Sequence, residues 1–249
     1  MQANISLKHA WPFVVAKRRC IYQHNNVYQR DDGTLAPTDH AKRWLARRMP
    51  GIANSRYTAG KLGCRRVVLN AYDEATFQTR TPWAARPGDL VFVGRLVSQK
   101  GCDTLVEALG HLQARGLCPG LTIVGDGPER AALEALGTAL GVAPQVTFAG
   151  RLEGEALARK LNAHRIFVAP SRYEEPFGIV ALEALGCGCV PVVSERGGLV
   201  DAIGPHGLTF PNGDAAALAD RLATLLEQGA DAQASLDGVD THLAEFHAD

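Results

Sequence analysis

Two glutamates eight positions apart carry the strongest chemical signal in the sequence. Glu175 and Glu183 lie in the segment 170–184, where an apolar run ends and a helix is expected to begin near Gly178. Hydroxyl-rich ligands such as a sugar and a ribose are held by carboxylates that accept hydrogen bonds. The free amides from Gly178 to Val180 at the start of that helix can face an anion. Either glutamate alone would be a solvated residue of an acidic helix, but the whole segment indicates a ligand site.

Two cations follow the end of another expected strand. Gly94 and Arg95 close the apolar run 90–94, and Lys100 comes five residues later, before a helix. A diphosphate needs fixed positive charge, a glycine that permits close approach, and amides at a helix N-terminus. Arg and Lys in a surface loop are usually just solvated, so this signal gains its weight from the paired glutamates.

A third candidate, the glycine-rich turn at residues 125–128, is more simply a tight connection into a helix. It does not have the three spaced glycines of a dinucleotide fingerprint after a first strand. A nicotinamide-dependent dehydrogenase is therefore disfavoured.

The elements that must position these residues recur along residues 89–228. Short β-branched runs alternate with helical stretches, and the runs are nearly continuously apolar, as expected for parallel strands covered on both faces. Right-handed crossovers then give a doubly wound, Rossmann-like parallel α/β sheet, whose ligands bind at the carboxyl ends of the strands. We expect strands at 90–94, 121–124, 146–149, 166–169, 190–193 and 208–210, and helices at 103–115, 129–140, 153–162, 178–185 and 215–227.

Residues 1–88 are less regular, and we expect them to form only part of a domain. The patterns favour a strand at 20–23, a loop at 31–33, a helix at 38–49 and a short strand at 67–69. Residues 82–88, rich in proline and glycine, are predicted to be a linker to the unit at 89–228. Residues 229–249 are predicted to be a polar tail that ends in a short helix.

The composition is that of a globular protein. Of 249 residues, 46% are hydrophobic and 21% are charged, which excludes a disordered chain. No apolar run approaches the roughly 20 residues that a membrane span needs, and no signal peptide is evident. The six cysteines are scattered without zinc-ligand spacing, and Cys187 and Cys189 are interpreted as small packing residues. We expect a reduced, cytoplasmic chain.

The zero net charge hides two oppositely charged parts. Residues 1–88 carry a net charge of +10 and residues 89–249 a net charge of −10. The basic part suits an anionic surface, although two solvated faces that attract each other would explain the charges equally well. In the basic segment 39–49, Trp44 and Leu45 either dock on the sheet or lie against an anionic membrane, as a peripheral contact. We expect no nucleic-acid partner.

The order of these motifs resembles the nucleotide-sugar-binding half of the retaining glycosyltransferases of family four, which have the GT-B fold. The likeness covers essentially all of residues 89–228, and the paired-glutamate segment is its most specific part. The motifs that carry it are Gly94-Arg95-Leu96, Lys100-Gly101, residues 125–128, residues 148–151, Pro170-Ser171, the pair Glu175 and Glu183, residues 186–193 and Gly197-Gly198-Leu199.

The resemblance implies two groups of donor-binding residues. Arg95 and Lys100, next to Gly94, would contact the donor diphosphate and stabilise the departing nucleotide, and Arg151 would border the base. Neither a metal nor a cofactor is implied, because the sequence has no Asp-x-Asp motif and two cations with a helix terminus can replace a divalent ion.

The paired-glutamate segment would hold the sugar and the ribose. By resemblance, Glu175 binds the transferred sugar and Glu183 the ribose hydroxyls. Backbone amides would face the sugar and phosphate from Phe177, Gly178, Ile179 and Val180.

The first 88 residues resemble the later part of the family's acceptor domain. His24 matches a His-Asn element at the cleft, although a lone histidine would more often be a loop or core residue. Asn54 lies in a matching strand-and-serine segment, and Ala71 departs from the glycine that usually follows the residue equivalent to Asn70. The family's opening strand, its Gly-rich loop and several α/β units have no counterpart, so we expect a truncated acceptor domain.

The function expected from the resemblance is that of a hexosyl-type transferase. It would move a sugar from a nucleotide diphosphate sugar to a glycan, lipid-linked or small acceptor with retention, and the shortened chain would be inactive or nearly so. Two alternatives stay open. One is a non-catalytic nucleotide-sugar-binding remnant, and the other is a GT-B-fold epimerase or phosphorylase.

Overall fold

The computed structural model describes residues 22–29, 34–48 and 51–247. The strand expected at 20–23 therefore begins outside the described residues, and the loop expected at 31–33 lies wholly outside them. Among the described residues, no helix has the length and apolar character to cross a membrane.

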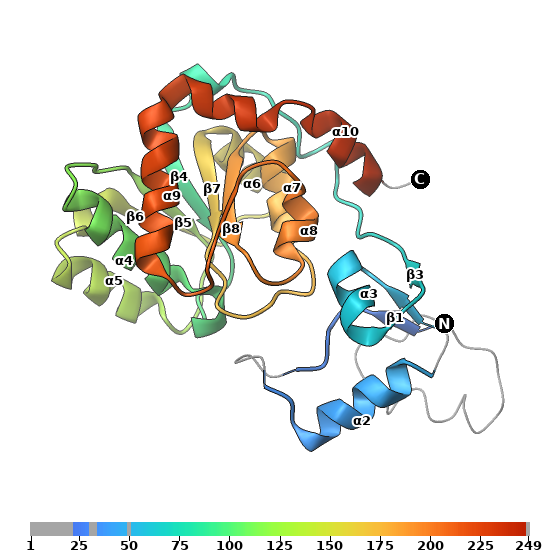
Figure 1. Cartoon of the computed structure of the whole chain (residues 1–249). Coiled ribbons are helices and arrows are strands. Elements are labelled where there is room, and N and C mark those ends of the chain that lie inside the picture. The colour runs from blue at the N-terminus through green and yellow to red at the C-terminus, as the bar shows by residue number, and fades with distance from the viewer. Residues whose placement is uncertain (1–21, 30–33, 49–50, 248–249) are drawn as a thin grey trace.

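A six-stranded parallel sheet forms the centre of the larger unit (Figure 1). Its strand order is β6-β5-β4-β7-β8-β9, so the order reverses between the central strands β4 and β7, which pair Leu90 with Ile166. This is the doubly wound Rossmann-like order, and the predicted α/β class is confirmed. The strands are β4 (Gly88–Val93), β5 (Leu121–Val124), β6 (Val146–Gly150), β7 (His164–Ala169), β8 (Val190–Ser194) and β9 (Leu208–Phe210).

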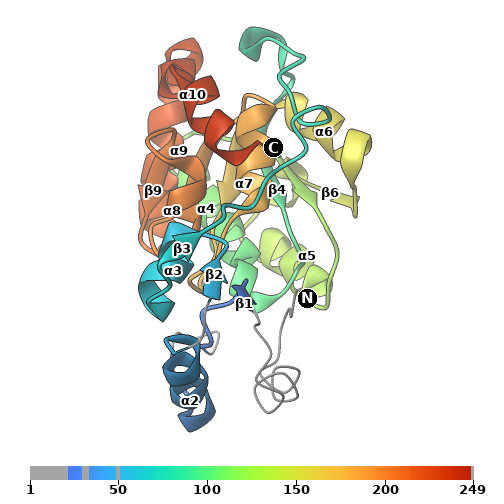
Figure 2. The ribbon, with the colours of Figure 1, turned by 90° about the vertical axis from the view of Figure 1, so that its right-hand side faces the viewer.

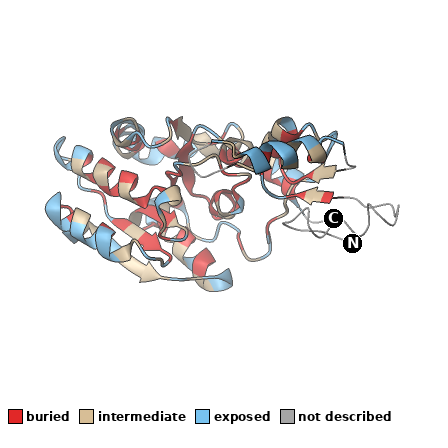
Figure 3. Ribbon diagram, turned by 90° about the horizontal axis from the view of Figure 1, so that it is seen from below, coloured by how far each residue is buried: buried red, intermediate tan, exposed pale blue. Residues whose placement is uncertain are grey.

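Helices cover both faces of this sheet because successive strand side chains point to opposite sides. In β4, Leu90 and Phe92 pack with residues of α4 (Cys102–Gln113), α5 (Arg130–Ala139) and α9 (Ala215–Gln228). Val91 belongs to the cluster on the opposite face. The helices there are α6 (Gly154–Asn162), α7 (Ile179–Gly186) and α8 (Leu199–Ile203), of which the five-residue α8 was too short to be predicted from periodicity. In Figure 3 the parts of the ribbon coloured as buried lie mostly in the interior of the larger unit.

A smaller unit lies beside the sheet. It contains a three-stranded parallel sheet in the order β1-β2-β3, with strands β1 (Tyr22–His24), β2 (Gly51–Ala53) and β3 (Arg66–Val67) (Figure 2). Its helices are α2 (Pro37–Ala46) and α3 (Arg56–Leu62).

The strand-and-serine segment that the resemblance placed around Asn54 is the end of β2 followed by Ser55. Helix α3 was not predicted, although it has clear local boundaries. Its cap is Ser55, whose side chain accepts a hydrogen bond from the backbone of Thr58, and the helix ends at Gly63 with φ +70°.

The connecting residues 82–88 pack against the larger unit. Trp83 and Arg86 are buried, and Trp83 begins a short 3₁₀ turn (Trp83–Ala85). The Arg86 guanidinium donates to the carbonyls of His164, at 2.8 Å, and Cys187, at 2.7 Å. These bonds satisfy a buried cation with backbone oxygens and fix this stretch to the large sheet.

The C-terminal residues also pack on the protein. They form η5 (Gly229–Leu236), α10 (Val239–Leu243) and η6 (Ala244–Phe246), and Leu243 and Phe246 are buried. Glu245 pairs with Arg56 of the smaller unit at 2.6 Å. The segment predicted to be a tail therefore contacts both units.

Candidate functional site

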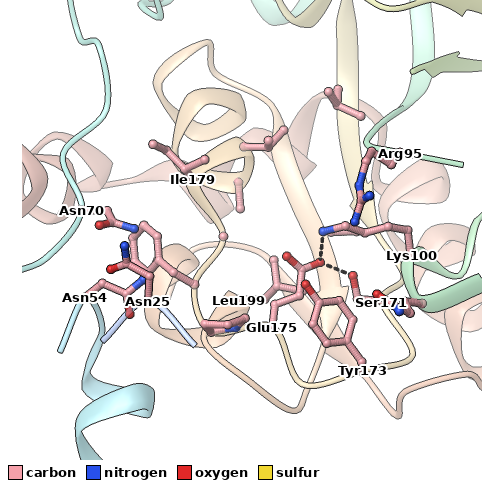
Figure 4. A pocket seen from close by; sticks show the side chains of 18 of the residues that line it. Asn25, Asn54, Asn70, Arg95, Lys100, Ser171, Tyr173, Glu175, Ile179 and Leu199 are labelled. Atoms are coloured by element: carbon pink, nitrogen blue, oxygen red, sulfur yellow. Dashed lines mark hydrogen bonds and ion pairs between the residues drawn. The ribbon is translucent and has the colours of Figure 1, made fainter. Parts of the chain in front are cut away.

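A cavity of about 570 Å³ opens at the carboxyl ends of β4 and β7 (Figure 4). This is the point where the strand order reverses, which is where open α/β sheets bind their ligands. Residues after β4 and β7 and at the start of α7 form one wall, and asparagines of the smaller unit line the other. The polar lining residues are Asn25, Asn26, Asn54, Asn70, Arg95, Gln99, Lys100, Ser171, Tyr173 and Glu175.

An ion pair stands at the centre of this cavity. Lys100 Nζ lies 2.9 Å from Glu175 Oε1, and the Ser171 hydroxyl donates to the same oxygen. The Tyr173 ring centroid is 5.5 Å from the ammonium. Glu175 is buried, so its charge is matched by one cation and one hydroxyl and is held in a single position.

The loop that carries Glu175 is fixed by two glycines of a neighbouring loop. The Gly198 amide donates to the Glu175 carbonyl at 2.6 Å, and the Glu175 backbone pairs with Gly197. At Gly197, φ is +106°, and a Cβ there would lie 2.7 Å from the Glu175 nitrogen. Only glycine fits at this crossing.

Arg95 connects the main cavity to a second one. It is exposed at the end of β4 and lines both the main cavity and an adjoining cavity of about 360 Å³. The smaller cavity is also lined by Gly94, Gly125 and Arg151. The structure thus brings the predicted diphosphate residues Gly94 and Arg95 next to the predicted base-side Arg151.

The start of α7 faces the main cavity as predicted. Phe177, Gly178, Ile179 and Val180 all line it. The first amides of a helix have no carbonyl partner within the helix and point away from its N-terminus. A Cβ at Gly178 would lie 2.6 Å from Leu199, so glycine lets α8 approach this corner.

Glu183 lies outside the residues that line either cavity. It is one helical turn beyond Ile179 on the same face of α7. Its side chain is partly buried, and the described residues give it neither a hydrogen bond nor an ion pair. Desolvation, with a smaller effect of Asp73, raises the pKa of Glu183 to about 7.

His24 differs from its prediction as a cleft residue. It is buried, its Nδ1 lies 3.1 Å from the Tyr28 hydroxyl, and burial lowers its pKa. Because side chains alternate along β1, His24 points with Tyr22 to the buried side. Asn25 and Asn26, which follow the strand, line the cavity instead. Their position at the carboxyl end of an expected strand was the signal that could have identified them.

Glu174, which sequence reasoning missed, joins the two units beside the cavity. Its carboxylate accepts hydrogen bonds from the Tyr57 hydroxyl, from Lys61 at 3.0 Å and from Gln29 at 3.2 Å. Burial alone would raise its pKa, but these three hydrogen bonds lower the pKa overall. Ser55 adds a hydrogen bond to the Pro176 carbonyl at 2.5 Å. The glutamate loop is therefore anchored directly to α3.

Candidate metal ligands do not gather in the part of the chain that the structure describes. Within it, no group of three or more His, Cys, Asp or Glu side chains is placed to hold a metal ion. Cys187 and Cys189 are free and buried at the turn between α7 and β8, and burial raises the pKa of both thiols.

The comparisons with known proteins agree on one family. The family model described as "Glycosyl transferases group 1" matches residues 73–237. Glycogen synthase of Mycobacterium tuberculosis is 36% identical over 174 residues, which cover 67% of this chain and 41% of that protein. Across eight curated relatives, the matched part is between 29% and 62% of their own lengths, so the chain spans less than two thirds of each.

Solved structures show the same fold. Anabaena Alr3699/HepE in complex with UDP superposes with a TM-score of 0.81 at 23% identity, over 99% of this chain and 74% of that chain. Sucrose-phosphate synthase of Thermosynechococcus elongatus gives a TM-score of 0.80 at 24% identity, over 96% of this chain and 66% of that chain. The expected GT-B architecture is thereby confirmed.

Proposed function

Because the chain belongs to the group 1 glycosyl transferases, we propose that it binds a nucleotide diphosphate sugar and transfers the hexosyl group to an acceptor with retention of anomeric configuration. The observation that carries this proposal is the Lys100–Glu175 ion pair, which lies beside Arg95 and the N-terminus of α7 in one cavity. The cavity thus offers cations and amides for a diphosphate and a buried carboxylate for a sugar hydroxyl.

In this proposal the donor lies along the carboxyl edge of the sheet. Arg95 and Lys100 hold the diphosphate and stabilise the charge that develops on it, and Gly94 and Arg151 border the nucleoside end. No metal or cofactor is required, since two cations and a helix N-terminus can supply the positive charge. The UDP in the Anabaena structure supports a nucleoside diphosphate as the ligand class.

The sugar and ribose are assigned to the glutamate segment. Glu175 accepts hydrogen bonds from the transferred sugar, and the amides of Gly178, Ile179 and Val180 face the sugar and phosphate. Glu183, one turn along α7, binds the ribose hydroxyls. Its lack of a partner among the described residues supports this role, because an unpaired, partly buried carboxylate gains from a hydroxyl donor.

Retention follows from same-face attack. The acceptor hydroxyl approaches the side of the sugar from which the diphosphate departs, and a phosphate oxygen takes the acceptor's proton as the glycosidic bond to the nucleotide breaks. Arg95 and Lys100 stabilise the negative charge on the departing diphosphate. Positioning of both substrates in one cleft supplies about 7–11 kcal/mol of the barrier lowering in well-oriented reactions.

The two alternatives predict different reactions. A non-catalytic remnant binds the nucleotide sugar without consuming it, whereas an epimerase or phosphorylase changes the donor or needs inorganic phosphate. The similarities to named transferases favour neither alternative.

A turnover assay with product analysis tests the proposal. The purified chain is incubated with a nucleotide sugar and a panel of acceptors, and released nucleotide and the anomeric configuration of any product are measured. We expect transfer by these 249 residues to be slow, its product to have the retained configuration, and Arg95→Ala to lose it. An inverted product or an epimerised donor contradicts the proposed reaction. Robust Arg95-dependent turnover would show that the chain needs no further acceptor-side segment.

We base the proposed cellular setting on the sequence. Scattered cysteines favour the reducing cytoplasm, and the basic smaller unit favours a peripheral contact with an anionic membrane. The surface that would make this contact is tested below.

A further inference from the structure

We propose that Asn212 is a positioning residue for the carboxylate of Glu175. Asn212 lies in the loop between β9 and α9 and lines neither of the two cavities described above. Its side chain joins the loop that carries Glu175 to the neighbouring loop that holds the Glu175 backbone. The inference rests on the proposed function, which assigns the transferred sugar to Glu175, and it adds a residue that acts through that carboxylate.

The Asn212 side chain makes hydrogen bonds in two directions. Its Nδ2 donates to the Ser171 carbonyl at 3.0 Å and lies 3.5 Å from the Arg172 carbonyl. Its Oδ1 accepts a hydrogen bond from the Arg196 backbone amide at 3.1 Å. A carbonyl only accepts and a backbone N–H only donates, so these partners fix which end of the carboxamide faces each loop. Making both contacts at once requires a side chain with a donor and an acceptor.

The donor end of Asn212 holds the residue that fixes the Glu175 carboxylate. Ser171 lies just after β7, is 1% exposed, and donates its hydroxyl hydrogen to Glu175 Oε1. Figure 4 shows this contact beside the ion pair with Lys100. The carbonyl that Asn212 contacts and the hydroxyl that contacts Glu175 belong to the same residue. A displacement of the Ser171 backbone therefore displaces the carboxylate.

The acceptor end of Asn212 holds the loop after β8. Arg196 immediately precedes Gly197 and Gly198, the two glycines that pair with the Glu175 backbone. Asn212 therefore contacts the first loop at the residue that binds the Glu175 side chain, and the second loop next to the residues that bind the Glu175 backbone. One carboxamide thus sets the position of the two loops relative to each other.

A sugar hydroxyl is sensitive to this position because one oxygen of Glu175 is already occupied. Lys100 and Ser171 both contact Oε1, and among the described residues Oε2 has neither a hydrogen bond nor an ion pair. The sugar must align with Oε2, and hydrogen bonds weaken steeply when their geometry is distorted. The side-chain contacts of Asn212 are with the loops after β7 and β8, whereas both diphosphate-binding cations come from the loop after β4. Asn212 therefore acts on the sugar contact and leaves the diphosphate contacts in place.

Calorimetric titration of the whole chain tests this inference, with UDP and UDP-glucose and with GDP and GDP-mannose as the paired probes. Asn212→Ala removes both contacts of the carboxamide. Asn212→Asp is nearly isosteric and keeps an acceptor for the Arg196 amide, but it places an oxygen against the Ser171 carbonyl. Gln78→Ala is the matched control, because it removes an exposed amide that donates to another backbone carbonyl, that of Ala75, at 3.0 Å.

A second measurement needs no ligand. The carboxyl carbon-13 resonance of Glu175, assigned by its loss in Glu175→Gln, reports the surroundings of this carboxylate in the unliganded chain. Asn212→Ala and Asn212→Asp should shift this resonance, and Gln78→Ala should leave it unchanged.

We expect both Asn212 variants to weaken binding of the sugar conjugate about fivefold, as the loss of one neutral hydrogen bond would, with binding of the diphosphate unchanged. Gln78→Ala should bind both ligands as the parent does. In a Glu175→Ala background, Asn212→Ala should cause no further loss, because the group through which Asn212 acts is absent.

Three binding results overturn the inference and leave the proposed function standing. They are equal weakening of both ligands in the Asn212 variants, unchanged binding of the conjugate in them, and further weakening when Asn212→Ala is added to Glu175→Ala. A parent chain that binds neither ligand contradicts the proposed function, and a Glu175 resonance that shifts in the Asn212 variants then still supports the positioning role. A Glu175 resonance that does not shift overturns the inference in every case.

Discussion

Glu175 and Glu183, the two glutamates of segment 170–184, have different surroundings despite their common motif. Glu175 is buried against Lys100 and Ser171, so its negative charge is compensated. Glu183 has no such partner among the described residues, and desolvation brings its pKa to about 7. Different environments give two carboxylates of one site different protonation behaviour. The glutamate assigned to the ribose is thus the one whose charge changes near neutral pH.

Nucleotide-sugar binding should depend on the protonation of Glu183. A ribose diol donates hydrogen bonds to a carboxylate, so affinity should rise several-fold from about pH 6 to about pH 8 as Glu183 ionises. The intact nucleotide sugar is the ligand of choice because its diphosphate does not titrate in this range. Calorimetric affinities at several pH values measure the effect, and Glu183→Gln should abolish it.

The stability of the unliganded chain should respond in the opposite direction. A carboxyl whose pKa rises from 4.5 to about 7 on folding keeps its proton in the folded state between these values, while the unfolded chain has lost it. The contribution of Glu183 to the free energy of unfolding therefore falls as pH rises through this window.

Two results of the binding experiment would contradict the assignment of Glu183. One is a nucleotide-sugar affinity that does not change with pH, and the other is a pH dependence of affinity that persists in Glu183→Gln.

At the scale of elements, α3 and the glutamate loop act as one structural unit. Glu174 accepts hydrogen bonds from Tyr57, Lys61 and Gln29 of the smaller unit, and it immediately precedes Glu175. The carboxylate that we assign to the sugar is therefore positioned partly by residues outside the larger unit. This contact also connects the smaller unit to the loop that carries Glu175.

Glu174→Ala should loosen the contact between the two units. Removing a hydrogen-bonded charge at a partly buried site should lower the free energy of unfolding by about 1–3 kcal/mol. It should also speed amide hydrogen exchange in α3. The contribution of Glu174 to the free energy of unfolding is fully present above its unfolded-state pKa near 4.5. It is lost as pH falls through the lower pKa of the folded state. Hydrogen exchange and urea unfolding measure both effects. Glu134→Ala, which removes an exposed carboxylate of α5, is the control, and equal exchange in α3 for the two variants would refute the role of Glu174.

Helix α2 presents a basic and aromatic surface. Trp44 is 56% exposed, and the Arg48 guanidinium carbon lies 3.8 Å from the centroid of its ring system. The interpretation that Trp44 docks on the sheet is therefore wrong. Arg43 is used internally, since it donates to the Val27 carbonyl at 2.9 Å, but Arg47 and Arg48 are exposed. Such a surface suits an anionic lipid headgroup layer.

We expect weak, salt-sensitive co-sedimentation of the chain with acidic vesicles and none with neutral ones. Each basic side chain near such a surface contributes about 1 kcal/mol, a term that salt screens. The double variant Arg47→Glu with Arg48→Glu should lose this binding. Charge reversal of Arg159 and Lys160 on α6 provides the matched control. The membrane role of Arg47 and Arg48 is contradicted if the chain does not sediment with acidic vesicles at low salt, or if the double variant sediments with them as the parent does. The two arginines would then be solvated surface residues.

How far the sequence predicted each element depended on the element's length and pattern. The strands around Leu90 and Ile166 are apolar runs buried on both faces, so their identity and parallel order were predictable. The elements β2 and α8 have three and five residues and are defined by pairing and packing that only the fold supplies. His24 was misplaced because one residue of register decides which face of a strand a side chain occupies. The contacts of Glu174 join residues more than 110 positions apart, which no local pattern reveals.

At the scale of the molecule, a charged cavity lies between two units that the chain connects twice. Residues 82–88 dock through Arg86, and the C-terminal segment contacts the smaller unit through Glu245. The larger unit supplies every charged residue that lines the cavity, and the smaller unit, as far as the structure describes it, supplies amides. Donor binding is therefore a property that these 249 residues should display on their own.

Calorimetric titration of the folded chain with UDP, GDP and their sugar conjugates tests the central claim most directly. We expect at least one nucleotide sugar to bind with a Kd between about 1 μM and about 1 mM. Glu183→Ala should weaken the nucleoside diphosphate and its sugar conjugate alike, whereas Glu175→Ala should spare the diphosphate and weaken only the conjugate. The account is contradicted if folded protein shows no heat with any of these ligands, or if both variants lose both ligands equally.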